Sequence, residues 1–339
     1  NSLLPLLGGV MISLLYKNLV LLALWNLSVS LLVLGVYIVK TRQLTGWRWL
    51  PTRGTIKRLL RFSPFMFIES AAINLFQQFD RLLVALTLGP AASGVYSVAT
   101  GVGLRMSIVA GSVTEVLLPY ASRKQSLGEK QELEVIVLKV SRYISLIAAL
   151  VGGLLIVWMK ELLSVWISPQ YAEANELFFS VIILAYGILS LSRPAHQTLV
   201  GLGKVKFTSL VYLSASLLML AAVYLLSIEY GLIGAGSANL MMVVLLCMNI
   251  FLYKWFERGQ VCRSFVTDLA LGALPMVLAL IFVNLEFTWP YKLIYTFGLL
   301  GLIIIVLTRD AEIVARMRQL VTGRSFHTPH DRDSGAEDR

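Results

Sequence analysis

The stretch NLFQQFDRLLVALTLGPAASGVYSVA, from Asn74 to Ala99, places Asp80 and Arg81 side by side in a run that is otherwise nearly all apolar. Adjacent residues on a helix point about 100° apart, so this acid and this base cannot neutralise each other face to face. A charge at the centre of a bilayer costs about 3 kcal/mol, and it usually faces a protein interior or a water-filled cavity. If the run crosses a membrane, each charged side chain therefore needs a partner or a polar surface elsewhere in the fold.

The composition of the whole chain supports a membrane setting. Of its 339 residues, 57% are hydrophobic and only 14% are charged, against roughly 25% charged residues in soluble domains. Several apolar runs exceed the length of about 18 residues that marks a membrane-spanning helix. The sequence therefore predicts an all-α fold, a polytopic integral membrane helical bundle with about ten transmembrane helices. The predicted segments are Ser2–Tyr16, Leu19–Val39, Phe62–Leu88, Gly94–Leu118, Tyr143–Met159, Leu177–Val200, Phe207–Ile228, Gly231–Tyr253, Phe265–Val283 and Tyr291–Leu307.

Basic residues gather in every second connection between these segments. The connection from Lys40 to Arg61 contains seven basic residues and no acid, and further basic groups follow Leu118, surround Lys204 and Lys254, and recur in the tail. Excess Lys and Arg stays on the cytoplasmic side of a membrane, so both ends of the chain are predicted to be cytoplasmic. Contacts of these basic loops with anionic membrane lipids account for the net charge of +10, and no nucleic-acid partner is needed.

Several more polar residues interrupt the apolar segments. Glu69 precedes Asp80 by almost three helical turns and shares its face, and Arg105 lies near mid-membrane in the next segment. For Asp80 and Arg105 we favour a pair that lines a cavity, because both are deep and the tight turn GPAASG makes their helices antiparallel neighbours. Arg193 and His196 lie near the inner end of a later segment, where snorkelling and ordinary packing are the favoured interpretations.

The opening stretch resembles the signature of the polysaccharide flippases, the family of O-antigen and teichoic-acid exporters. The matching residues, in the family's seventh and eighth helices, are Phe79, Asp80, Leu88, Gly89, Gly94, Tyr96 and Ala99. A second region is similar to the family's ninth and tenth helices, through Tyr171, Ala174, Gly203 and Lys204. A third, GLIGAGSANL at residues 231–240, looks like the opening of its twelfth helix. The resemblance covers nearly the whole chain.

The resemblance implies membership of a larger exporter superfamily, which has two six-helix lobes and commonly two extra C-terminal helices. On that pattern, residues 1–39 are the last two helices of an incomplete first lobe, and residues 40–61 are a basic cytoplasmic linker. Residues 62–258 form the six-helix second lobe, residues 259–309 the two additional transmembrane helices, and residues 310–339 a cytoplasmic tail that is partly disordered. About four helices of the first lobe are missing from this pattern, so an N-terminally truncated fragment is predicted.

The resemblance also implies a transporter that flips oligosaccharide precursors linked to undecaprenyl diphosphate across the bacterial cytoplasmic (inner) membrane. Alternating access about a central site is the general mechanism of such transporters. The sequence has no Gly-rich phosphate-binding loop ending in Gly-Lys-Ser or Gly-Lys-Thr, so an ion gradient or the substrate gradient is the expected energy source. Other polysaccharide-assembly proteins are a further option as partners. We expect no cofactor, and Cys247 and Cys262 match no metal-binding spacing.

Intramembrane polar side chains supply the candidate site. An anionic diphosphate is well held by guanidinium groups, which form charge-assisted hydrogen bonds with phosphate, and a coupling ion is well held by carboxylates. The candidates for headgroup binding are Arg81, Arg105 and Gln77. The candidates for ion coupling are Glu69, Asp80 and Glu115, and the weaker site candidates are Arg193 and His196.

Three alternative functions stay open at this point. A multidrug exporter of the same superfamily would carry cationic substrates, for which unpaired acids would be better suited than Arg81 and Arg105. A membrane polymerase or ligase acting on lipid-linked sugars would need catalytic groups in a sizeable outer loop, whereas the outer loops here are short. An enzyme is therefore not expected. A truncated lobe could also have a structural role in assembly.

Overall fold

The computed structural model describes residues 8, 19–45, 53–256, 259–285 and 289–309, and every regular element in these ranges is a helix. Contacts divide the chain into two units, residues 1–61 and residues 62–339. The first unit contains α2 (Leu19–Thr45) and the beginning of α3 (Arg53–Asn74), which continues into the second unit. The predicted segment Ser2–Tyr16 lies almost entirely outside the described residues, as does the predicted tail after Arg309.

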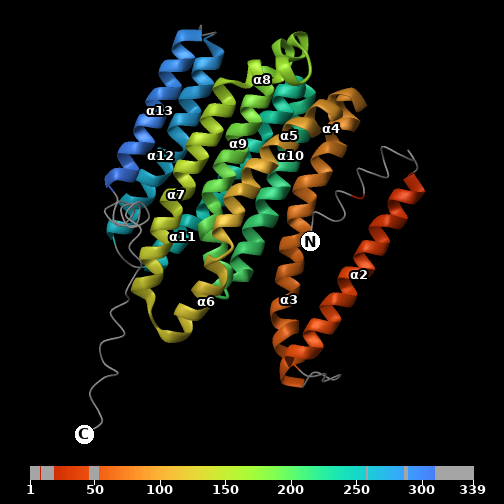
Figure 1. The fold of residues 1–339 in the computed structure, drawn as a ribbon, viewed down its shortest axis with the longest axis vertical. Coiled ribbons are helices and arrows are strands. Elements are labelled where there is room, and N and C mark those ends of the chain that lie inside the picture. Colours follow the sequence, from red (N-terminus) through yellow and green to blue (C-terminus); the bar gives the residue numbers. More distant parts are fainter. Residues whose placement is uncertain (1–7, 9–18, 46–52, 257–258, 286–288, 310–339) are drawn as a thin grey trace. The chain divides into compact units, whose positions relative to one another are not determined.

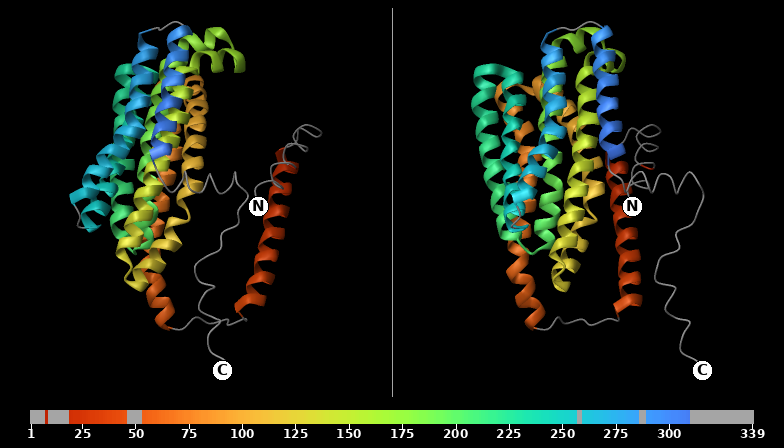
Figure 2. Two further views of the ribbon diagram at one scale, coloured as in Figure 1. Left: turned by 60° about the vertical axis from the view of Figure 1, so that its left-hand side comes forward. Right: turned by 90° about the vertical axis from the view of Figure 1, so that its left-hand side faces the viewer.

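The second unit is a bundle of helices (Figures 1 and 2), most of which run side by side along one direction. After α3, its elements are η1 (Leu75–Phe79), α4 (Asp80–Leu88), α5 (Pro90–Thr114), α6 (Leu117–Leu127), α7 (Lys130–Val157), α8 (Met159–Trp166), α9 (Pro169–Gly201), α10 (Val205–Ala238), η2 (Asn239–Leu246), α11 (Cys247–Phe256), α12 (Gly259–Asn284) and α13 (Trp289–Arg309). η1 is a short π-helix and η2 is a 3-10 helix.

Seven stretches of the described helices are long and apolar enough to span a membrane, which confirms the predicted all-α, multi-pass membrane bundle. The number is smaller than the predicted ten for identifiable reasons. One stretch, Val205–Phe256, contains two of the predicted segments. The two are joined without a break at the bend at Gly231, so they count as a single stretch. The helix that runs from α3 to α4 is not among the seven, since polar residues such as Glu69 and Asp80 lower its hydropathy. Ser2–Tyr16 lies almost entirely outside the described part of the chain.

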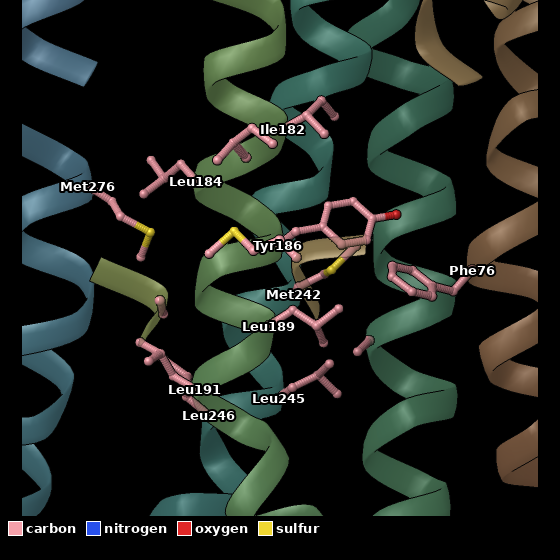
Figure 3. Packing of buried hydrophobic residues seen from close by; sticks show 14 of the residues in the cluster. Phe76, Ile182, Leu184, Tyr186, Leu189, Leu191, Met242, Leu245, Leu246 and Met276 are labelled. Atoms are coloured by element: carbon pink, nitrogen blue, oxygen red, sulfur yellow. The ribbon is translucent and has the colours of Figure 1, made fainter. Parts of the chain in front are cut away.

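α9 is the central helix of the second unit, because it packs against α5, α6, α7, α8, α10, α12 and η2. Its first turn is defined by Pro169 and by the Ser168 hydroxyl, which accepts a hydrogen bond from the Tyr171 backbone N–H at 3.2 Å. Apolar side chains cover its whole circumference instead of a single stripe, as expected for a helix with neighbours on every side. Figure 3 shows Tyr186 and Leu189 of this helix within the resulting core.

Two glycines let α12 approach the centre of the bundle. Met276 of α12 points toward α9 (Figure 3). A Cβ atom would lie 2.5 Å from the Met276 sulfur at Gly152 of α7 and 2.4 Å from it at Gly187 of α9. The sulfur therefore occupies a hollow that exists because these two residues lack side chains. Small residues permit the same kind of close helix packing in membrane proteins generally.

α10 changes direction at Gly231, whose backbone has φ 60° and ψ −140°. Phe207, near the beginning of α10, stacks on Phe251 of α11 with the ring centroids 4.2 Å apart. Since these two rings lie about equally far before and after the bend along the chain, the two arms run antiparallel. The chain therefore forms a helical hairpin at this glycine, and α10 packs along η2.

We expect Gly231→Ala to destabilise the protein by about 1–3 kcal/mol, because a residue with a Cβ atom is strained in this backbone conformation. The thermal unfolding midpoint of the purified protein in detergent measures the effect. Gly298→Ala is the control, since a Cβ atom added there meets no atom within 4 Å and alanine favours a helix. If both variants melt at the same temperature, the backbone at Gly231 imposes no strain on alanine.

Candidate functional site

The helix that runs from α3 through η1 to α4 carries two buried carboxylic acids. Glu69 is 4% exposed and Asp80 is 1% exposed, and the π-helical η1 lies between them. π-helical turns within α-helices occur frequently at functional sites. Each acid contacts a different set of helices, so the candidate site consists of two separate groups of residues. We call them the Glu69 cluster (Glu69, His196 and Thr208) and the Asp80 cluster (Asp80, Tyr96 and Asn239).

The Glu69 cluster joins three helices. Oε1 of Glu69 in α3 lies 2.6 Å from Nε2 of His196 in α9, and Oε2 accepts a hydrogen bond of 2.6 Å from the Thr208 hydroxyl of α10. The Tyr212 ring, also on α10, lies edge-on to the His196 ring with the centroids 5.1 Å apart. Both carboxylate oxygens of Glu69 are therefore occupied inside the protein. The structure thus brings together Glu69 and His196, which the sequence suggested only as separate candidates.

Arg193 lies one helical turn before His196 on α9. Its Nη2 donates a hydrogen bond of 3.1 Å to the Ser107 hydroxyl of α5, so the guanidinium is held within the bundle by a neighbouring helix. Its Nε is buried and has no hydrogen-bond partner among the described residues. The side chain is only partly buried.

The Asp80 cluster is a directed chain of hydrogen bonds. Nδ2 of Asn239 in η2 donates to the Tyr96 hydroxyl at 2.9 Å, and that hydroxyl donates to Oδ2 of Asp80 at 3.0 Å. Oδ1 of Asp80 accepts a bond of 2.7 Å from the backbone N–H of Arg81. Tyr96 and Asn239 are completely buried. The Asp80 carboxyl group is thus satisfied by α5 and by its own backbone.

The predicted pairing of Asp80 with Arg105 is wrong. Arg105 is exposed on α5 and makes no hydrogen bond or ion pair with any residue that the structure describes. The side chain of Asp80 is buried and accepts its hydrogen bond from the Tyr96 hydroxyl. The prediction treated all of GPAASG as the turn, whereas only Gly89, with φ 91°, separates α4 from α5.

This shorter turn explains why Tyr96 is the partner of Asp80. Asp80 lies nine residues before Gly89 and Tyr96 lies seven residues after it, so the two side chains reach similar depths in antiparallel helices. The Ser93 hydroxyl also donates a hydrogen bond of 3.0 Å to the Arg81 carbonyl across the same turn. Tyr96 belongs to the motif that carried the family resemblance, and its position could have identified it as a partner. Asn239, far away in the sequence, gave no comparable signal.

The remaining predicted residues lie nearer the surface of the second unit. Glu115 is exposed, as Arg105 is, whereas Gln77 and Arg81 are partly buried. The Nε atom of Arg81 is buried without a hydrogen-bond partner among the described residues. The roles predicted for these residues in headgroup binding and ion coupling stay predictions.

Comparison with known proteins places these features in a family. The model of the family described as polysaccharide biosynthesis protein matches residues 1–176, which is just over half of the chain. A protein from Shigella flexneri named "Putative O-antigen transporter" is 23% identical over 228 residues, a region that covers 67% of this chain and 52% of that protein. The chain thus spans about half the length of this curated relative. No solved structure matches the chain.

The Asp80 cluster can be tested by a double-mutant cycle. Tyr96→Phe removes the hydroxyl that links Asp80 with Asn239, and we expect it to cost about 1–3 kcal/mol because two buried polar groups lose their partner. Asp80→Ala should cost a similar amount, and the double variant should cost clearly less than the sum of the single variants. Unfolding of the purified protein in detergent measures these energies.

The matched controls follow from the same structure. Tyr224→Phe alters an exposed tyrosine of α10 and should change the unfolding free energy by less than about 0.5 kcal/mol. The losses from Asp80→Ala and Arg105→Ala should simply add, because these residues are not in contact. Additivity for Asp80 and Tyr96, or coupling between Asp80 and Arg105, would contradict the geometry described above.

Proposed function

The chain belongs to the polysaccharide biosynthesis protein family, and on that premise we propose that it exports lipid-linked oligosaccharide precursors. Its substrate would be an oligosaccharide attached to undecaprenyl diphosphate, flipped from the cytoplasmic to the outer leaflet of the bacterial inner membrane. The name of the Shigella flexneri relative supports transport of a polysaccharide precursor. We propose transport as the function in preference to an enzymatic activity.

The observation that carries this proposal is the position of Arg105. It lies fifteen residues after Pro90, the first residue of α5, which corresponds to about 22 Å along the helix. The hydrocarbon core of a bilayer is about 30 Å thick, so with Pro90 at its outer face this exposed guanidinium would lie inside the core, about 8 Å from the inner face. A charged group there is costly against lipid and normally faces water or protein. A hydrated, cationic surface is what an anionic diphosphate headgroup requires.

Arginine suits this headgroup because its guanidinium can form two parallel hydrogen bonds with a phosphate. Arg81 and Gln77, partly buried on the preceding helix, are the further candidates for contacts with the headgroup. The lipid tail can stay in the bilayer, so only the polar head needs shelter. A cationic drug would be repelled by the same surface, which favours a lipid-linked sugar over the substrates of a multidrug exporter.

The transport cycle that we propose is alternating access between two lobes. Residues 62–258 would form one lobe and residues 1–39 part of the other, joined by the basic linker at residues 40–61. An ion gradient would supply the energy, with Glu69, Asp80 and Glu115 as the carboxylates available to bind the ion. Glu69 and Asp80 are buried and hydrogen-bonded, whereas Glu115 is exposed.

The proposed orientation can be tested by cysteine labelling in intact cells, after Cys247 and Cys262 have been replaced by serine. Ser126, near the end of α6 in the basic stretch that follows Leu118, and Ala174, near the beginning of α9, are both exposed. A membrane-impermeant maleimide added outside should label Ala174→Cys and leave Ser126→Cys unlabelled, because excess basic residues stay in the cytoplasm. The opposite pattern would reverse the orientation of the bundle.

The role of Arg105 can be tested by complementation of a strain that lacks its O-antigen transporter. We expect Arg105→Ala to abolish the restored O-antigen, while Arg105→Lys keeps part of the activity because it preserves the charge but not the bidentate geometry. Arg123→Ala is the control, since Arg123 is exposed on α6 in the basic connection. Membrane levels of all variants are compared by immunoblot. Normal O-antigen with Arg105→Ala would exclude this residue from the substrate site.

A further inference from the structure

The interaction between Glu69 and His196 requires a proton between the two side chains. Oxygen and nitrogen atoms 2.6 Å apart form a hydrogen bond only if one of them carries hydrogen. The second oxygen of Glu69 accepts from Thr208 at 2.6 Å, and we assign the hydrogen of the other contact to Nε2 of His196. This arrangement describes a carboxylate facing an Nε2–H group.

The other ring nitrogen of His196 is in a different situation. Nδ1 is buried and has no hydrogen-bond partner among the described residues, and the whole side chain is 8% exposed. A neutral imidazole with hydrogen on Nε2 has a lone pair on Nδ1. An unpartnered acceptor inside a protein is costly, and this one lies on a ring whose other nitrogen already contacts a carboxylate. Nδ1 is therefore an atom at which the cluster can take up a proton.

We propose that the Glu69–His196 pair is the proton-binding site that couples transport to a proton gradient, with Nδ1 of His196 as the atom that accepts the proton. This role in coupling rests on the function proposed above. In the unloaded form Glu69 is a carboxylate and His196 is neutral, so the pair has a charge of −1. One proton taken from the aqueous side converts imidazole to imidazolium, and the pair becomes neutral without breaking the bond between Nε2 and Oε1.

The groups around the pair determine how tightly the proton is held. From α10, the Thr208 hydroxyl contacts Glu69 and the Tyr212 ring contacts His196. On α9, Arg193 lies one helical turn before His196, and its guanidinium is hydrogen-bonded to the Ser107 hydroxyl of α5. Because Arg193 lies one helical turn from His196 on the same helix, we expect its positive charge to oppose a proton on His196, whereas Glu69, 2.6 Å away, attracts that proton.

The burial of the pair gives the proton a physical role in the cycle. An isolated carboxylate is expensive to remove from water, whereas a neutral ion pair with hydrogen bonds is far less so. Closure of the protein over the cluster therefore favours the loaded form, and access to water on the other side favours release. Pro194, two residues before His196, removes one backbone hydrogen bond from α9 and makes this part of the helix the easiest to bend.

Titration of His196 tests the proton site directly and needs no transport assay. The chain contains three histidines, His196, His327 and His330, so His327→Gln with His330→Gln leaves a single imidazole. The chain with these two changes, labelled with 15N-histidine and placed in lipid nanodiscs, is followed by NMR as a function of pH. We expect the Nδ1 signal to show one protonation step as the pH is lowered.

Two variants should move this midpoint in opposite directions. Glu69→Gln removes the attracting carboxylate, so the variant should hold the proton more weakly and the midpoint should fall. Arg193→Gln removes the repelling cation, so the midpoint should rise, and this variant leaves the pair intact if Glu69→Gln does not fold. An imidazole that keeps one protonation state over the whole range, or that shifts in the wrong direction in Arg193→Gln, would overturn the proposal.

Complementation then separates the proton site from the function on which it rests. If the chain restores O-antigen and His196→Gln does not, with equal amounts of both proteins in the membrane, the proton site is part of the transport cycle. Equal export by His196→Gln would overturn the coupling role even if His196 titrates. If the unaltered chain restores nothing while His196 titrates as described, the proposed export function fails and the proton-binding site stands.

Discussion

The hydrocarbon region of a bilayer offers no water to an ionised or polar side chain, and this constraint determines how the helices of the second unit are joined. Each polar group on the helix from α3 to α4 must be satisfied by another helix or by a polar surface. The carboxyl group of Glu69 is hydrogen-bonded to side chains of α9 and α10. That of Asp80 is hydrogen-bonded to Tyr96 of α5, whose hydroxyl in turn accepts a hydrogen bond from Asn239 of η2. An α-helix saturates its own backbone, so these side-chain bonds select which helices become neighbours.

An apolar layer separates the two clusters. Phe76 of η1 lies between Glu69 and Asp80 in the sequence, and its ring centroid is 6.4 Å from that of Tyr186 in α9. Figure 3 shows both rings with Met242 and Leu245 close by. A Cβ atom at Gly103 would lie 2.6 Å from the Tyr186 ring, so the ring can occupy this place only beside a glycine. Close packing of this kind leaves little room for water, and each polar cluster therefore has an apolar contact beside it.

The sequence predicted the parts of this structure that depend on local pattern. Apolar runs identified the membrane helices, and the depth of Asp80 and Arg105 identified residues that need partners. The partners themselves depend on where helices begin and end, and one misplaced boundary was enough to pair Asp80 with Arg105 in place of Tyr96. The contact of Glu69 with His196 joins residues 127 positions apart. A periodic pattern is local and does not show which residues so far apart in the sequence will meet. The path of the chain through several turns decides which helices become neighbours.

α5 is the element that connects the interior of the bundle with its exposed surface. Tyr96 and Ser107 face inward, where they bind Asp80 and Arg193, and Arg105, two residues before Ser107, is exposed. On the proposal made here, a proton on His196 repels the guanidinium that is bonded to Ser107, because Arg193 and His196 lie one turn apart on α9. That repulsion would act on α5 two residues from the proposed headgroup site. The hydrogen bond between Arg193 and Ser107 thus offers a short physical connection between the charge inside the bundle and the cation that we expect to meet the substrate.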